Sequence, residues 1–185
     1  GNAGTLIRVA EAAGCAGVVL TERSVDVHNP KVVRATAGAL LRLPVAEGAN
    51  ATELLSAASA AGVPSWATVK DGGTSLDDAA LVGACLLVVG SEAHGLPGDV
   101  VAAATCGLTI PMDGTVESLN AAVAGSLVAF EAARQRRTGA GPAATETTST
   151  AWTTTTAPAS GASIGWRPSL VPAVVVGVDV AGFGQ

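Results

Sequence analysis

Between residues 1 and 137, short apolar runs alternate with segments of helical periodicity, and this alternation strongly limits the possible folds. The run 85–89 is apolar at every position, which is typical of a parallel strand buried on both faces. The pattern predicts an α/β domain in which helices cover a parallel sheet. We expect strands at 18–21, 41–45, 63–69, 85–89 and 107–110, and helices at 6–13, 30–38, 53–61 and 119–135.

The composition changes abruptly after Arg137. Residues 138–160 contain nine threonines together with Ala, Gly, Ser and Pro, and only one charged side chain. Such a segment buries too little apolar surface to offset the entropy lost on ordering. We therefore expect one domain over residues 1–137 and a Thr/Ala/Gly-rich, disordered tail over residues 138–185. The sequence does not show where the apolar run 174–176 in this tail would dock.

Cysteine content and charge exclude several classes of protein. The three cysteines are far apart and form no CxxC pair, so neither a disulfide framework nor a zinc site is indicated, and a reducing, cytoplasmic context is expected. No apolar stretch reaches the length of a membrane helix, so no membrane association is expected. The net charge of −5 does not by itself indicate nucleic-acid binding, although the first quarter of the chain gathers Arg8, Arg23, Lys31, Arg34 and Arg42.

Three glycine-containing polar segments stand at the ends of predicted elements: 2–8, 88–97, and 110–114 followed by 118–120. The first enters a helix, and the other two directly follow predicted strands. Ligands of open α/β sheets bind beyond the carboxyl ends of the strands. We therefore expect the three segments to converge on one site.

In order and spacing, these segments resemble the motifs of the SpoU/TrmH branch of the SPOUT RNA methyltransferases, across about residues 1–137. The motifs are N-x-G-x-x-x-R, present as Asn2, Gly4 and Arg8; G-x-E-x-x-G-L, present as Gly90, Glu92, Gly95 and Leu96; and I-P-M followed by S-L-N, present at 110–112 and 118–120. The resemblance implies a parallel sheet with helices on both faces, a C-terminal deep trefoil knot and a homodimer. It also implies methyl transfer from S-adenosylmethionine to a ribose 2′-hydroxyl of RNA, with rRNA favoured over tRNA and no metal.

The resemblance also assigns roles to individual residues. Backbone groups of Gly90, Ile110 and Leu119 would hold S-adenosylmethionine, with Gly95 and Met112 of the same motifs also at the cofactor. Glycine lets the backbone approach a ligand closely.

Arg8 would act at the ribose hydroxyl. Arginine is ordinarily protonated, so besides acting as a base in a strongly perturbed setting it could orient phosphate and stabilise a developing alkoxide. The other polar motif residues at the catalytic site would be Asn2, Glu92, Ser118 and Asn120.

Other interpretations remain open for the same residues. Arg8 could be a solvated helix residue, and Ser118 and Asn120 could serve only as helix caps. The strand and the RNA-binding domain that commonly precede the first motif are not in the sequence, so a truncated or non-catalytic RNA- or nucleotide-binding homologue is the alternative function. A Rossmann dehydrogenase is excluded because no G-x-G-x-x-G follows a predicted strand.

Overall fold

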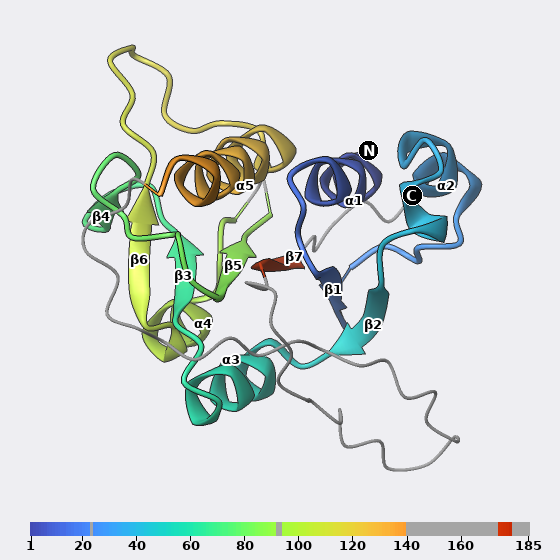
Figure 1. The fold of residues 1–185 in the computed structure, drawn as a ribbon, viewed down its shortest axis with the longest axis horizontal. Helices are drawn as coiled ribbons and strands as arrows, with labels where there is room; N and C mark the ends of the chain where they lie inside the picture. The colour runs from blue at the N-terminus through green and yellow to red at the C-terminus, as the bar shows by residue number, and fades with distance from the viewer. Residues whose placement is uncertain (23, 92–93, 140–173, 179–185) are drawn as a thin grey trace.

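A computed structural model describes residues 1–22, 24–91, 94–139 and 174–178 (Figure 1). Its centre is a seven-stranded sheet in the order β2-β1-β7-β5-β3-β6-β4, and every neighbouring pair is parallel. The predicted α/β class with a parallel sheet is confirmed. The strands are β1 (Gly17–Thr21), β2 (Val45–Ala49), β3 (Ser65–Thr68), β4 (Thr74–Ser75), β5 (Cys85–Val89), β6 (Cys106–Thr109) and β7 (Val174–Val178).

Helices lie on both faces of the sheet. In Figure 1, α1 (Asn2–Ala12), α2 (Pro30–Ala35) and α5 (Ala121–Thr138) lie above it, and α3 (Ala51–Ala60) and α4 (Gly98–Ala103) lie below. Strand β5 contributes to both cores because successive side chains point to opposite faces. Leu87 and Val89 join the cluster under α1 and α5, whereas Leu86 and Val88 join the cluster over α3 and α4.

Strand β7 lies in the middle of the sheet, between β1 and β5. Val176 pairs with Val18 on one side and with Leu87 on the other. The sequence predicts that this segment belongs to a disordered tail, and for these five residues the structure differs. The reason is tertiary: β-branched residues suit a strand whose N–H and C=O groups are paired on both sides. The remaining tail, 140–173 and 179–185, lies outside the described residues, and the domain boundary at 137 stays a prediction.

The second predicted strand is misplaced. Residues 39–41 form a short 3₁₀-helix, η1 (Ala39–Leu41), and the strand begins only at Val45. The cause is Gly38, whose φ of 83° turns the chain into η1, so the apolar residues that follow form a helical turn. The short elements β4 and α4 were not predicted, because they are too brief to show a period.

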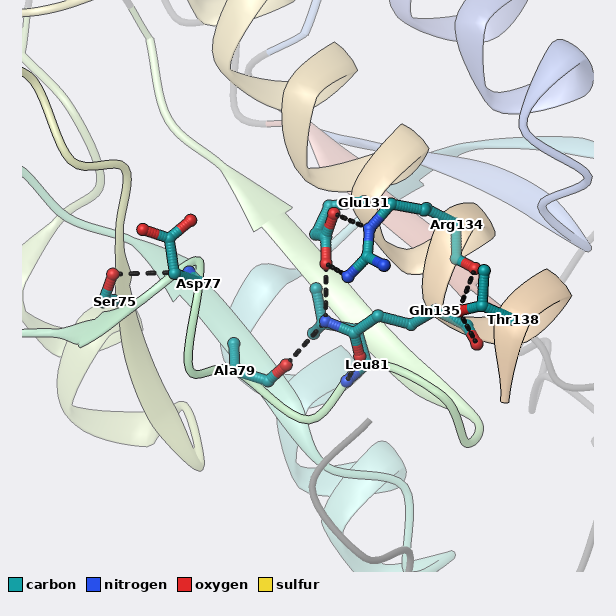
Figure 2. Close-up of polar contacts among 8 residues, drawn as sticks. All are labelled: Ser75, Asp77, Ala79, Leu81, Glu131, Arg134, Gln135 and Thr138. Atoms are coloured by element: carbon teal, nitrogen blue, oxygen red, sulfur yellow. Dashed lines mark hydrogen bonds and ion pairs between the residues drawn. The ribbon is translucent and has the colours of Figure 1, made fainter. Parts of the chain in front are cut away.

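The last turns of α5 are fixed to the segment that leads into β5. The buried Gln135 side chain donates from Nε2 to the carbonyl oxygen of Ala79 and accepts from the backbone N–H of Leu81, both at 2.8 Å (Figure 2). Glu131 accepts a further bond from Gln135 and pairs with Arg134.

None of the described helices has the length and apolar character needed to cross a membrane.

Candidate functional site

A cavity of about 320 Å³ opens at the carboxyl ends of three adjacent strands, β5, β3 and β6. Its walls come from the residues that follow each strand and from the start of α5. This is the edge at which parallel α/β sheets bind ligands. The lining includes Thr68 at the end of β3 and Lys70 after it, Gly90, Ser91, His94 and Gly95 after β5, Ile110 and Met112 after β6, and Glu117, Ser118 and Leu119 before α5.

The loop after β5 is tight, and glycine makes it possible. A Cβ atom on Gly90 would collide with the backbone of Gly95 and Leu96. Ser91 and Gly95 exchange two backbone hydrogen bonds of 3.1 and 2.9 Å, and Gly95 has a φ of 66°. The loop therefore brings bare backbone to the cavity wall. Glu92, which the sequence assigns to this site, lies outside the described residues.

The start of α5 is joined to the start of α1. Asn120 caps α5, because its Oδ1 accepts from the N–H groups of Ala122 and Val123 at 2.9 and 3.2 Å. Its Nδ2 also donates to Oδ1 of Asn2 at 3.2 Å. The capping interpretation is therefore confirmed for Asn120, and for Ser118 it stays a prediction. The first and third motifs, 118 residues apart in the chain, meet through this pair.

Helix α1 packs closely on α2 through the glycine of the first motif. A Cβ atom on Gly4 would lie 2.6 Å from both the Ala35 Cβ and the Val32 carbonyl oxygen. Arg8 is exposed on the same helix and forms no ion pair with a described residue. Of the residues described, those lining the cavity include neither Arg8 nor Asn2.

All five residues predicted to bind the cofactor lie in the cavity wall, together with Ser118. Their individual roles stay predictions. Sequence reasoning missed Thr68, Lys70 and Glu117 as lining residues, and it gave no role to Ser91 within the predicted segment 88–97. A signal for Lys70 was present, because it directly follows the predicted strand 63–69 and so had to lie at the ligand-binding edge.

The charged groups at the cavity are Lys70 and Glu117, whose Nζ and Oε2 atoms are 3.7 Å apart.

The buried cysteines are poor nucleophiles. Burial raises the pKa of Cys15 to about 11 and that of Cys85 to about 12, so both thiols stay protonated at neutral pH. Nothing in the described part of the site therefore favours covalent catalysis by cysteine.

One group of possible metal ligands gathers elsewhere among the described residues. Ligand atoms of Asp26, His28 and Glu47 lie within 4.8 Å of one another, and all three residues are exposed. The carboxylates already accept backbone hydrogen bonds, Asp26 from His28 and Glu47 from Val27, at 2.8 Å each. These bonds explain the cluster as support for a turn, and we assign it no metal.

The chain is similar in sequence to a known protein family and to curated proteins. Residues 1–130 match the model of the SpoU rRNA Methylase family. The chain is 38% identical over 136 residues to the "Uncharacterized tRNA/rRNA methyltransferase" of Mycobacterium sp. (strain KMS), covering 74% of this chain and 43% of that protein. It is 35% identical over 144 residues to the 23S rRNA (uridine(2479)-2′-O)-methyltransferase of Streptomyces viridochromogenes, covering 75% and 50%. The chain thus spans about half the length of these relatives or less.

Solved structures of RNA methyltransferases are similar to this chain in fold and in sequence. The AdoMet-bound rRNA methyltransferase from Sinorhizobium meliloti is similar with a TM-score of 0.68 and 34% identity, over 72% of this chain and 51% of that one. The SpoU methyltransferase AviRb from Streptomyces viridochromogenes, in complex with AdoMet, gives a TM-score of 0.66 and 33% identity, over 76% and 54%. With a family model covering residues 1–130 and a parallel-sheet fold shared with these enzymes, the chain belongs to the SpoU rRNA methylase family.

Proposed function

We propose that this chain carries the catalytic domain of an S-adenosylmethionine-dependent RNA methyltransferase that acts on a ribose 2′-hydroxyl. The observation that carries the proposal is the cavity at the carboxyl ends of β5, β3 and β6, which is lined by residues of the second and third motifs. Family membership and the two similar structures named as AdoMet-bound support the choice of cofactor.

The cavity wall suits a nucleoside-containing cofactor. It is mostly apolar, with a few polar side chains and exposed backbone beside Gly90, as small-molecule sites usually are. In this proposal, backbone groups of Gly90, Ile110 and Leu119 bind the adenine, and Gly95 and Met112 complete the wall. Bound S-adenosylmethionine supplies an activated methyl group on its sulfonium, so the protein's main task is positioning.

The catalytic roles fall to residues around the first and third motifs. Arg8 binds the RNA near the target ribose and stabilises the oxygen as it loses its proton. The Asn2–Asn120 bond fixes the start of α1, and with it the helix that carries Arg8, relative to α5 at the cavity. Glu92 orients Arg8 or Asn2 through a charge-assisted bond, and Ser118 contributes a hydroxyl at the cavity mouth.

Further parts of the proposal concern substrate and assembly. The relative named as a 23S rRNA 2′-O-methyltransferase supports ribose methylation and favours rRNA over tRNA. Family membership supports a C-terminal trefoil knot and a cytoplasmic location.

A homodimer is supported by the apolar stripe Val123, Leu127 and Phe130 on α5, whose residues are 48%, 44% and 45% exposed. Sedimentation of the wild-type chain and of Leu127→Glu tests the dimer, and a monomeric wild type would contradict it.

The first experiment is calorimetric titration of S-adenosylmethionine into the full chain. We expect saturable binding, and we expect Leu119→Arg to abolish it because the new side chain fills the cavity. Arg8→Ala is the complementary variant: it should bind the cofactor normally but lose 2′-O-methyl transfer to unmodified rRNA, detected as alkali-resistant linkages. Binding without transfer by the wild type would favour a non-catalytic homologue. Absence of binding by folded protein would refute the proposal.

A further inference from the structure

Two side chains of opposite charge face each other at the cavity wall. Lys70 follows β3 and Glu117 precedes α5, and their Nζ and Oε2 atoms are 3.7 Å apart. Apart from His94, they are the only ionisable side chains among the described residues that line this cavity. The remaining described lining residues are apolar or uncharged polar residues. Lys70 and Glu117 therefore place one positive and one negative charge side by side on the cavity wall.

The ion pair is weak and can exchange partners. The side chains of Lys70 and Glu117 are 54% and 89% exposed. Pairs of this kind contribute little to stability, because water competes for both groups. Separating the two side chains to admit a ligand therefore costs little, provided that the ligand offers each of them a new partner.

The cofactor offers such partners. The amino-acid end of S-adenosylmethionine is a zwitterion with an α-carboxylate and an α-ammonium group on the same carbon. A lysine and a glutamate side by side complement this pair of charges. The adenosine end of the molecule is neutral and suits the remaining wall, with its apolar side chains and exposed backbone.

We propose that Lys70 and Glu117 form the subsite for the amino-acid end of the cofactor, an inference that rests on the function proposed above. The Lys70 ammonium binds the α-carboxylate, and the Glu117 carboxylate binds the α-ammonium. Without the cofactor, the two side chains bind each other and close this side of the cavity. Both are binding residues that orient the cofactor, and neither takes part in the transfer of the methyl group.

The test compares two ligands that share the adenosine and the sulfur. S-adenosylhomocysteine has the zwitterionic end, whereas methylthioadenosine lacks it. Calorimetric titrations of both ligands are made on the full chain, on Lys70→Gln and on Lys31→Gln. Lys31 is the chain's other lysine and is exposed at the start of α2, so it is a matched control.

We expect Lys70→Gln to weaken S-adenosylhomocysteine binding about tenfold, as for the loss of one hydrogen bond to a charged group, and to leave methylthioadenosine binding unchanged. Glu117→Gln should show the same selectivity with a smaller loss, because Glu117 is more exposed. Lys31→Gln should alter neither ligand.

Equal weakening of both ligands by Lys70→Gln would overturn the subsite, since the lysine would then shape the whole cavity. Unchanged binding of both would also overturn it and would leave Lys70 available to an RNA phosphate. In either case the wild type still binds, so the proposed cofactor pocket survives. Failure of folded wild type to bind either ligand would refute the pocket and the subsite together.

Discussion

The strands on the two sides of β7 differ in how deeply they are buried. On one side of β7 lie β5, β3, β6 and β4, and β5 is buried at all five positions. On the other side lie β1 and the edge strand β2, whose three central residues are exposed. The first side holds the cavity, and the second holds α1 and α2 with the exposed Arg8 and Lys31. The cavity therefore lies on the side whose strand β5 is fully buried, and the exposed Arg8 and Lys31 lie on the side that ends in the edge strand β2.

Several contacts join these sides within the described residues, and two of them bear directly on the proposed site. Strand β7 pairs with β1 and β5, and α1 packs on α5, where Asn2 meets Asn120. The proposed reaction needs Arg8 from one side and the cofactor from the other. The joint between the sides is therefore as important for activity as the cavity itself, and variants can weaken each separately.

Breaking the joint should have the largest effect. Val176→Pro removes a backbone donor from the middle of β7 and introduces a ring that a central strand does not accommodate, so we expect the free energy of unfolding to fall by about 3 kcal/mol or more. Urea denaturation measures it. Val116→Pro, at an exposed loop position, is the control and should change stability little. Equal curves for the two variants would show that the sides hold together without β7.

Altering the cavity side alone should strongly weaken cofactor binding. Gly90→Ala places a Cβ against the backbone of Gly95 and Leu96, so the loop must move away from the cavity wall. We expect S-adenosylhomocysteine to bind at least about a hundredfold more weakly, which corresponds to about 2.7 kcal/mol. The control is Gly83→Ala, where a Cβ meets nothing within 4 Å. Normal affinity in Gly90→Ala would contradict the proposed cofactor site.

Altering the other side should reduce stability without touching the cavity wall. Gly4→Ala forces α1 away from the backbone of α2, and overpacking of this kind costs about 2 kcal/mol. Gly98→Ala, at the first residue of α4, has free space and serves as the control. Affinity for S-adenosylhomocysteine should stay close to wild type in Gly4→Ala at temperatures where it is folded. A large loss of affinity would mean that the two sides are tightly coupled.

The smallest expected effect depends on pH. Hydrogen bonding to Arg134 holds the pKa of Glu131 below its usual value. A carboxyl group whose pKa is lowered by folding stabilises the fold above its unfolded pKa, and this contribution disappears as the pH falls through the folded value. Glu131→Gln should therefore be slightly less stable than wild type at pH 7 and should converge with it in acid. A constant difference at all pH values would assign the effect to packing.

How much the sequence could predict differed from element to element. The run 85–89 was placed without error because an apolar strand buried on both faces has a distinctive pattern. The second strand was placed too early because nothing in its hydropathy reveals the left-handed turn at Gly38. Strand β7 was missed because composition averages over the whole tail, whereas five residues suffice to fill a gap between two strands.

The same contrast holds for the site. Gly90, Ile110 and Leu119 could be found because they belong to motifs at strand and helix ends. Lys70 and Glu117 belong to no motif. The sequence does not show that they form a pair, because about 46 residues separate them in the chain. Isolated charges of this kind become interpretable only when the fold brings them to one wall.

The central place of β7 also bears on how the protein is made. Val18 and Val176 are about 158 positions apart in the chain, yet they are paired neighbours in the sheet. A nascent chain must hold the facing edges of β1 and β5 unpaired until residues 174–178 have been synthesised, and exposed strand edges are sites of intermolecular pairing. Premature termination before residue 174 would leave both edges open, so synthesis of β7 becomes a condition for solubility.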